Sequence, residues 1–593
     1  MKRARRLCLK LAVALTVLTA FLLPLKFGGI TGLAEAPGFF PPDLIDWLIV
    51  SSWPTEIFSI VCGAALLLTL CGGAVRMPAS RETRLMLWLW GSILALAVLP
   101  GFVNTAVRDY ALAMLTHWLG IGAWCWATAL LLADDSRRRK WFVGALLLGF
   151  LLAVLAGWRL YFWGFAETRR YFAERVAAGG VAVDEQLQIK LDDDRVYATF
   201  NSCNSFAGFI ILVGAAFVVG AGKFGERFEP RKVSKWLFFG AAALLTLGIL
   251  PLTRSRGALL CALLAALGAF FASRLPRAAK LAALALAVAV GIGGAWYVHR
   301  AGRGFSSGME RLDYLRTSSL LVAAHPLAGA GWDGFFREHM RVKRTGSDEA
   351  AHDPHNIVAS FAAQSGVLPG LLALAALLLP LYSLFRRYCD FDPWRRAVCW
   401  GCAAAALHML MELDYLVPAE PAAFWLLALS ALTGGEASSA AVTEPPRRRY
   451  PMIAAAALAA VFSLAFGVFV LHGDLAFARF AGLIRPEPGE KWSPPSDEAA
   501  ENALLQVRRS RQRIPFALEL FAEYRAQCGD RDTAERLLRE SLALSGDRPG
   551  VCRKLAELVR DRGDAAAAAR HWRKAHELFP AKYPSVMPPA PGR

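Results

Sequence analysis

The chain has 593 residues, 56% of them hydrophobic, and a formal net charge of +18; its mean hydropathy is +0.38. The composition excludes an ordinary soluble globular protein, because so much apolar surface cannot be kept out of water by one core. The positive charge is better explained by membrane topology than by nucleic-acid binding, since most Lys and Arg before residue 450 stand in short connections between apolar segments.

Apolar segments of about 20 residues, the length that crosses a bilayer as a helix, recur along the chain. The first follows Met1-Lys-Arg-Ala-Arg-Arg, which is typical of a signal peptide; because no small-residue cleavage site follows, we expect an uncleaved first helix. The sequence predicts an all-α polytopic bundle of about 13 transmembrane spans. The predicted spans are 7–29, 55–75, 84–104, 110–133, 141–163, 198–221, 235–252, 257–273, 279–298, 366–387, 397–413, 417–433 and 451–472.

Every second connection between these spans is rich in Lys and Arg. The basic segments are residues 2–6, 76–84, 137–140, 223–235, 274–280, 386–396 and 447–449. Because Lys and Arg accumulate on the cytoplasmic side, the alternation predicts a cytoplasmic N-terminus. An odd number of spans then places the chain after residue 472 on the extracytoplasmic side.

Basic residues also cluster on the outer side, where few are expected. The long outer connections are 30–54, 164–197 and 299–365, and the last is the largest. The outer cluster consists of Arg254, Arg256, Arg300, Arg303, Arg311, Arg316, Arg337, Arg341, Lys343 and Arg344. Guanidinium groups bind oxyanions through forked donors, so this cluster predicts an anion site, with phosphate as the best fit.

The tail after residue 495 differs in kind, because it is polar and helical in period. Gly529-Asp530 recurs as Gly563-Asp564, a shift of 34 residues, and the same shift relates Ala534 to Ala568 and Ala522 to Ala556. This helix–turn–helix period resembles the tetratricopeptide repeat. Such repeats bury their faces against neighbours, so we expect the tail to pack on the outer loops or on a protein partner.

The predicted organisation has four parts. Residues 1–197 are N-terminal transmembrane helices, and 198–433 are a catalytic membrane core with the outer loop 299–365. Residues 434–494 hold linker sequence and the last span, 451–472, and 495–593 are the extracytoplasmic helical repeats. Cys528 and Cys552 could pair in the tail if their geometry allows it.

Motifs in a fixed order lie between spans of the right polarity. They are Thr199-Phe-Asn201-Ser-Cys-Asn204, Ser255-Arg256-Gly257, Arg311-Leu-Asp-Tyr-Leu-Arg316 with His325-Pro326-Leu-Ala-Gly329-Ala-Gly331, His355-Asn356 with Gln364-Ser-Gly366-Val-Leu-Pro-Gly370, and more weakly His408 to Asp414 with Pro418. Together they resemble the O-antigen ligase and O-antigen polymerase family of bacterial envelope glycosyltransferases, over about residues 199–420. No single motif is specific; their order and spacing carry the resemblance.

The resemblance implies a multi-pass enzyme of the bacterial inner membrane, with a fold like the C superfamily of glycosyltransferases. It implies transfer of a glycan from a polyprenyl diphosphate carrier to a hydroxyl on the periplasmic side, with inversion and without a metal or cofactor. By motif, Arg256 and Arg311 match the family's diphosphate-holding arginines, and His355 matches its proposed catalytic histidine. Further candidate substrate-binding residues are Arg254, Arg316, Asn201, Asn204 and Asn356.

The residue types suit this chemistry. Negative charge builds on the departing diphosphate, and positioned guanidinium donors stabilise it in a site shielded from water. The acceptor hydroxyl must lose a proton as it attacks, and a histidine near neutrality can take it, for roughly a 100- to 10,000-fold gain in rate.

Each residue also has a structural alternative. Arg254 and Arg256 could reach the membrane interface or cap a helix, and Arg311 and Arg316 could form a solvated face. Caps are alternatives for His355, Asn201 and Asn204, and a tight turn is expected at Gly329 and Gly331. A metal site at His352-Asp353-His355 is disfavoured because ligands so close in sequence rarely surround one ion. For Glu412 and Asp414 we expect a salt bridge to an outer arginine.

The acceptor is left open by these motifs. A lipid or core glycan would make the protein a ligase, a growing glycan a polymerase, and a polypeptide a protein O-oligosaccharyltransferase. A lipid-linked oligosaccharide transporter and a non-catalytic scaffold for the tail are alternatives of other classes. A transporter predicts charges spread through the spans and an internal membrane repeat, and neither is evident.

Overall fold

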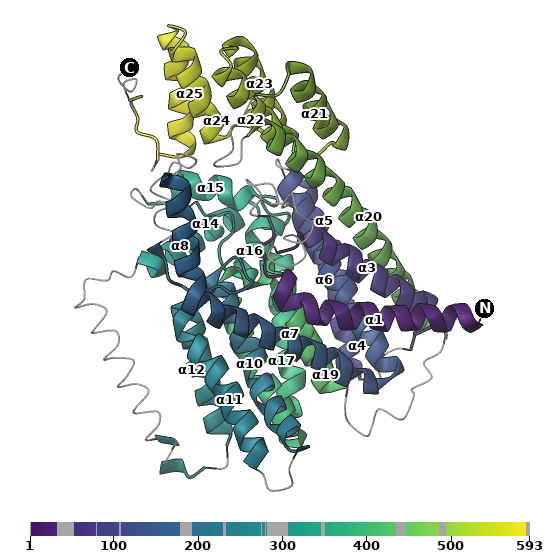
Figure 1. Cartoon of the computed structure of the whole chain (residues 1–593). Coiled ribbons are helices and arrows are strands. Elements are labelled where there is room, and N and C mark those ends of the chain that lie inside the picture. The colour runs from purple at the N-terminus through teal and green to yellow at the C-terminus, as the bar shows by residue number, and fades with distance from the viewer. Residues whose placement is uncertain are drawn as a thin grey trace.

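The computed structural model shows a helical protein (Figure 1). It describes residues 2–32, 52–76, 78, 80–105, 108–177, 192–228, 233–273, 275–278, 280–281, 306–344, 350–433, 446–485, 494–580 and 582–588. No strand occurs within these ranges, as the all-α prediction requires.

The helices of the first half are α1 (Lys2–Lys26), α3 (Thr55–Cys71), α4 (Arg81–Ile93), α5 (Leu99–Val103), α6 (Arg108–Asp134), α7 (Arg139–Arg159), α8 (Phe165–Ala177), α10 (Cys203–Gly225), α11 (Val233–Ile249) and α12 (Arg256–Ala272). Those of the second half are α14 (Ser306–Ala324), α15 (Gly334–Val342), α16 (Ile357–Ser365), α17 (Val367–Arg386), α18 (Pro393–His408), α19 (Ala419–Leu432) and α20 (Pro446–Ile484). Side-chain caps start several of them: Ser202 accepts from the first turn of α10, Ser255 from that of α12 and Asp392 from that of α18.

Two helices form the centre of the membrane part. Every residue of α6 from Tyr110 to Leu132 is buried, and so is every residue of α19. A helix that is apolar on all sides needs neighbours all round, so the other spans surround this pair. Trp124 of α6 joins them through a hydrogen bond of 2.9 Å from its indole N–H to the carbonyl of Ala422.

Within the described residues, seven helices are long and apolar enough to cross a membrane: Lys2–Lys26, Arg108–Asp134, Ser136–Glu174, Cys203–Gly225, Val233–Thr253, Val367–Arg386 and Tyr450–Ile484. Thr55–Cys71, Arg256–Ala272 and Ala419–Leu432 are apolar but shorter. The predicted count of about 13 is therefore not confirmed. Most of the predicted span 279–298 lies outside the described residues.

The connections between helices meet at two ends of the bundle. At one end Lys223 lies 3.1 Å from Asp392, and Arg386 lies 3.3 Å from Glu82, so basic segments far apart in sequence are neighbours. At the other end the amide of Asn201 donates to the carbonyl of Gly28 at 3.1 Å. This grouping is what alternate crossing requires; which end faces the cytoplasm stays a prediction.

The last span continues without a break toward the tail. We predicted that the span ends at residue 472, yet α20 runs to Ile484, and its last turns pack on the tail helices through Phe477, Phe480 and Ile484 (Figure 1). The tail helices are α21 (Asp497–Ser510), α22 (Ile514–Gln527), α23 (Arg531–Ser545), α24 (Pro549–Arg560) and α25 (Ala565–Leu578). A helix continuous with its span fixes the direction of the tail better than a flexible linker would.

The two tail hairpins, α22–α23 and α24–α25, repeat one local design. Gly529 and Gly563 have φ of 87° and 90°, and the aspartate after each caps the next helix. The paired residues that the 34-residue shift relates, Ala522 with Ala556 and Ala534 with Ala568, are all buried. These features fit the predicted internal repeat, while its assignment to the tetratricopeptide type stays a prediction. Cys528 is exposed and Cys552 is buried, and both are free thiols.

Candidate active site

The described residues of segment 306–365, which we predict to be the outer segment, lie against the turn that follows α18, and Arg311 makes the first contact. Its Nε donates to the carbonyl of Met411 at 3.1 Å, and its terminal nitrogen forms an ion pair with Glu412. The Arg311 side chain is 33% exposed, whereas that of Glu412 is 5% exposed. The guanidinium therefore lies at the boundary between a buried carboxylate and solvent.

The imidazole of His355 contacts the same carboxylate from the other side. Its Nδ1 lies 3.3 Å from Oε2 of Glu412, and the ring stacks on Tyr314 with centroids 5.1 Å apart. Because an ionised carboxylate only accepts hydrogen bonds, Nδ1 is the protonated nitrogen of a neutral His355 and Nε2 is left as the basic one. Glu412 thus holds both Arg311 and His355.

Asn356 explains why the chain places His355 there. Its side chain caps α16 by accepting from the amides of Val358 and Ala359 at 2.9 and 3.0 Å, and it donates to the carbonyl of Leu410 at 2.8 Å. The alternative role of His355 as the cap of this helix is thus wrong, because Asn356 is the cap. His355 instead adopts a left-handed backbone, with φ of 55°. Asn356 has a structural role that locks the histidine segment onto the 409–412 turn.

Asp353 and His352 have contacts of their own, different from those of His355. Asp353 is buried and accepts from Ser360 at 2.6 Å, from Gln364 at 3.1 Å and from the hydroxyl of Tyr415. Burial raises the pKa of Asp353 to about 6, although these hydrogen bonds oppose the shift. His352 stacks on Phe336 with ring centroids 3.9 Å apart. The three side chains of the His352-Asp353-His355 run thus take three different sets of partners.

The tight turn expected at Gly329 and Gly331 has a left-handed backbone at both glycines, with φ of 66° and 81°. A Cβ on Gly329 would stand 2.2 Å from the backbone of Gln364, so only glycine fits there. The amides of Ala330 and Gly331 donate to the carbonyls of Ala363 and Gln364 at 2.9 Å. This pairing holds the loop between α14 and α15 against α16.

Arg254 and Arg256 lie at the start of α12. Ser255, not an arginine, caps this helix, and both guanidinium groups are exposed and make no hydrogen bond or ion pair within the described part of the chain. A Cβ on the next residue, Gly257, would stand 3.3 Å from Nε2 of His408, so the start of α12 touches the end of α18. Arg256 and Arg311 therefore flank the same 408–412 turn.

The structure separates Arg316 from this group. It is exposed on α14, five residues after Arg311, so it points about 140° away around the helix. Asn201 accepts from the hydroxyl of Ser52 at 3.1 Å, and Asn204 accepts from Arg195 at 2.8 Å. Neither asparagine caps α10, because Ser202 does so. Arg195 also donates to the carbonyl of Thr253 at 3.1 Å, which places Asn204 near the Arg254 turn.

The two acidic candidates have different roles. The salt bridge expected for Glu412 is confirmed by its contact with Arg311. The one expected for Asp414 is wrong, because this residue is fully buried and pairs with His408. A Cβ on Gly208 would stand 2.4 Å from Asp414 and 2.9 Å from Glu420, so α10 packs directly over two buried carboxyl groups.

A cavity of about 430 Å³ opens beside His355. Its polar walls come from Thr31, His352, Asp353 and His355, and its apolar walls include Ile30, Leu413 and Leu416. A space with convergent polar groups on an apolar lining is typical of a small-molecule site.

Two residues of the candidate site, Tyr314 and Arg195, were not predicted from the sequence. Tyr314 stands three residues after Arg311 on one helix, a spacing that places both side chains on one face and could have indicated the pair. The link from Arg195 to Asn204 carried no motif, since Arg195 lies in a mixed-charge segment with nothing to distinguish it.

The comparison with known families supports the broad class. A family model described as O-antigen ligase matches residues 241–375. No curated protein matches the chain. The matched segment contains Arg254, Arg256, Arg311 and His355, but it ends before Glu412.

The match supports the resemblance to the O-antigen ligase family and suggests a glycosyltransferase-type enzyme of cell-surface glycan assembly. The seven long apolar helices are those of a multi-pass membrane protein. The family implies a lipid-linked glycan and an acceptor as substrates.

Proposed function

We propose that the protein transfers a glycan from a polyprenyl diphosphate carrier to an acceptor hydroxyl at the outer face of a bacterial inner membrane. The observation that carries this proposal is the position of Glu412, which contacts both Arg311 and His355 beside the exposed Arg256 turn. Guanidinium groups for a phosphorylated leaving group and a base for a hydroxyl thus flank one turn. The expected likeness to the C superfamily of glycosyltransferases is part of this proposal.

In the proposed reaction the acceptor oxygen attacks the anomeric carbon, and the bond from that carbon to the diphosphate oxygen breaks. The bonding electrons leave with the diphosphate, whose added negative charge Arg256 and Arg311 stabilise. The proton of the acceptor hydroxyl passes to Nε2 of His355. Glu412 is a positioning residue, since it fixes the tautomer of the imidazole and stabilises the cation that forms.

Arg254 and Arg256 are the groups best placed to receive the diphosphate first, because neither guanidinium has a protein partner in the described residues. Asn204, held by Arg195, is a candidate to contact the donor near the Arg254 turn. Arg316, exposed on another side of α14, would contact the sugars rather than the diphosphate. Asn201 would serve the same purpose from the start of α10.

The test uses full-length protein purified in detergent, where transport across a membrane is impossible. The variants Arg256→Ala, Arg311→Ala and His355→Ala are assayed for release of polyprenyl diphosphate from lipid-linked glycan. We expect each loss of an arginine to slow turnover by about 100-fold, the effect of removing one donor to a developing anion. Wild-type turnover in all three variants would overturn the mechanism.

The matched controls are Arg573→Ala and His571→Ala, on the exposed and half-buried surface of the tail helix α25. Donor consumption by the wild-type protein in detergent also separates an enzyme from a transporter. Surface glycans of a deletion strain identify the acceptor. Loss of chain attachment indicates a ligase, single repeat units indicate a polymerase, and unglycosylated protein indicates a protein glycosyltransferase.

A further inference from the structure

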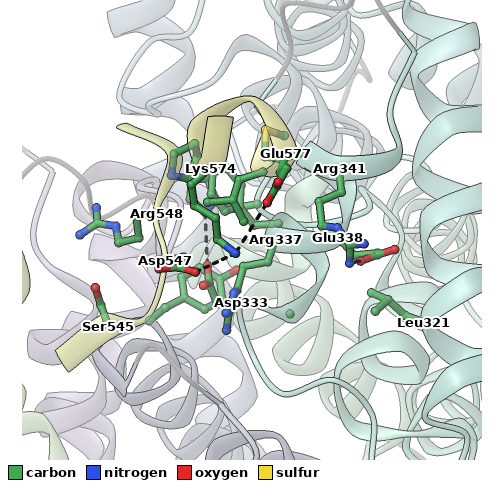
Figure 2. A pocket seen from close by; sticks show the side chains of 18 of the residues that line it. Leu321, Asp333, Arg337, Glu338, Arg341, Ser545, Asp547, Arg548, Lys574 and Glu577 are labelled. Atoms are coloured by element: carbon green, nitrogen blue, oxygen red, sulfur yellow. Dashed lines mark hydrogen bonds and ion pairs between the residues drawn. The ribbon is translucent and has the colours of Figure 1, made fainter. Parts of the chain in front are cut away.

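A second, larger cavity of about 760 Å³ lies between the outer segment and the tail. One wall is α15, with Phe336, Arg337 and Arg341, and the opposite wall is the tail, with Arg548 and Lys574. Figure 2 shows Arg337 and Lys574 extending into the same space from these two sides.

The cavity adjoins the one beside His355. Both are lined by Gly32, Tyr110 and His352. A chain-like ligand could therefore extend from His355 past His352 and along the underside of the tail. The tail in this way lines a cavity that adjoins the one beside His355.

The tail is held firmly on both sides of this space. On one side Arg513 forms a buried ion pair with Asp474 at 2.8 Å, and its amide donates to Asp109 at 3.0 Å. On the other side Met340 of α15 packs in one apolar cluster with Cys552 and Trp572. Because the tail is attached at two separate places, the cavity beneath it is a fixed part of the fold.

The lining favours a polar, hydroxyl-rich ligand. Guanidinium and ammonium donors alternate with carboxylate acceptors, as Lys574 lies 3.1 Å from Asp547 and 3.9 Å from Glu577 (Figure 2). Tyr110, Phe336 and Phe516 add aromatic surface. Sugars offer both hydroxyl groups that donate and accept and apolar C–H faces, so this mixture suits them better than a lipid tail or a strongly charged anion.

Arg337 adds a second observation. Its guanidinium makes no hydrogen bond or ion pair with the described part of the chain. A Cβ on Gly546, at the turn between α23 and α24, would stand 3.5 Å from its terminal nitrogen, so the side chain reaches across to the tail. Arg337 therefore offers free donors where a ligand would pass.

We propose that this cavity binds the saccharide chain of one of the two substrates, so that the tail is a glycan-binding wall of the active site. This inference rests on the proposed function, because the saccharide is a substrate only if the protein transfers glycans. The sugars belong either to the donor, beyond its diphosphate, or to the acceptor, behind its reacting hydroxyl.

The test uses the full-length protein with lipid-linked glycan extracted from the producing strain. Steady-state kinetics are measured for Arg337→Glu and Lys574→Gln, with one substrate varied while the other is saturating. We expect KM for one substrate to rise about tenfold or more while kcat changes less than twofold, as when charge-assisted hydrogen bonds to a ligand are lost. The substrate whose KM rises identifies the source of the saccharide.

The matched control is Arg573→Glu, which makes the same charge reversal on α25 outside the cavity lining. A second measurement, binding of the saccharide freed from the extract by mild acid, needs no turnover; we expect Arg337→Glu and Lys574→Gln to weaken it about tenfold and Arg573→Glu to leave it unchanged. Unchanged KM for both substrates and unchanged saccharide binding in the two lining variants would overturn this inference. If Arg311→Ala still slows turnover, the proposed function survives that result.

Discussion

Two arginine–carboxylate pairs differ in burial, and this difference separates a structural role from a chemical one. Arg513 and Asp474, which join the tail to α20, are 7% and 6% exposed. Arg311 and Glu412 are 33% and 5% exposed, and His355 shares the carboxylate. Arg513 and Asp474 are a closed pair, because both are buried, and such a pair can only hold its two segments together. Arg311 and Glu412 are an open pair, because the arginine reaches solvent and can exchange the carboxylate for a substrate.

The surroundings of the two pairs strengthen this contrast. Arg513 forms contacts through its backbone as well as its side chain, because its amide donates a hydrogen bond to Asp109 of α6. Near Arg311 the exposed groups of Arg254 and Arg256 and the cavity beside His355 leave room for a ligand. We therefore expect substitutions at Arg513 and Asp474 to change stability, and substitutions at Arg311, Glu412 or His355 to change turnover.

The largest effect is expected at the open pair. His355→Ala should lower turnover by about 100- to 10,000-fold, because it removes the group that accepts the proton of the attacking hydroxyl. The melting temperature should stay close to that of the wild type, since the ring is partly exposed and Asn356 still caps α16. Single-turnover transfer measures the first quantity, and thermal unfolding in detergent measures the second.

The control for this prediction is His571→Ala in the tail, which should leave turnover unchanged. A His355 variant that melts early but turns over normally would reverse the assignment of the open pair. The turnover of Glu412→Gln should lie between that of His355→Ala and that of the wild type. The amide keeps a hydrogen bond to the imidazole but loses the charge that stabilises its protonated form.

At the closed pair the expected effect is on stability. Arg513→Ala leaves Asp474 buried without a partner, and breaking such a pair costs about 3–5 kcal/mol. The attachment of the tail to α20 and α6 should weaken by this amount, while Arg573→Ala on the exposed side of the tail should have no effect. Denaturant titration of the detergent-solubilised protein, followed by limited proteolysis after residue 485, measures the difference.

The comparison fails if Arg311→Ala destabilises the protein as much as Arg513→Ala does. A stricter test of the closed pair is the double variant Arg513→Ala with Asp474→Ala, which removes both charges of the pair. This variant should recover part of the lost stability, because Asp474 no longer stays buried as a charge without its arginine.

The sequence predicted the helical class and the order of the motifs, because both depend on local patterns. Apolar runs, basic connections and the positive-φ glycines at 329 and 331 are visible in the chain without tertiary information. The number of spans was harder, since Thr55–Cys71 and Ala419–Leu432 are apolar but too short for a simple length criterion. The helical continuation of α20 to Ile484 was missed because residues 473–484 mix polar and apolar residues.

At the candidate site, local patterns indicated single residues but not their partnerships. Arg311, His355 and Glu412 lie up to 101 positions apart, and no periodicity relates them. Arg316 stood in the same motif as Arg311, yet helical geometry turns it to another side. Asp414 was expected to bind an arginine like Glu412, but its position in the short turn before α19 directs it to His408. Only the tertiary packing of α12 and α14 against the 408–412 turn decides these pairings.

A pH effect of intermediate size is expected at Asp353, which supports the segment before His355. Its folded-state pKa is about 6, above the reference value of 3.8, because burial disfavours the ionised form. Its contribution to stability is therefore full below about pH 4 and is lost as the pH rises through about 6, to at most about 3 kcal/mol. The difference in unfolding free energy between wild type and Asp353→Asn, measured from pH 4 to 7, should follow this curve.

The control for the pH curve is Leu544→Ala, at an exposed position of the tail, which removes no titratable group and should give a difference that does not vary with pH. A flat difference for Asp353→Asn as well would contradict the assignment of the buried carboxyl. In that case the hydrogen bonds from Ser360, Gln364 and Tyr415 would offset the burial of the charge completely.

The smallest effect tests whether the two tail hairpins are equivalent. Asp530 accepts from the amide of Thr533 at 3.1 Å, and Asp564 accepts from that of Ala567 at 2.9 Å, so each caps the second helix of its hairpin. Replacing either with alanine should cost about 1 kcal/mol, the usual loss for an N-cap. Equal losses at the two positions, measured by denaturant unfolding, are what a true internal repeat requires, because the two caps then occupy the same structural position. A loss of stability at one position only would mean that the 34-residue period exists in the sequence but that the two hairpins are not structurally equivalent.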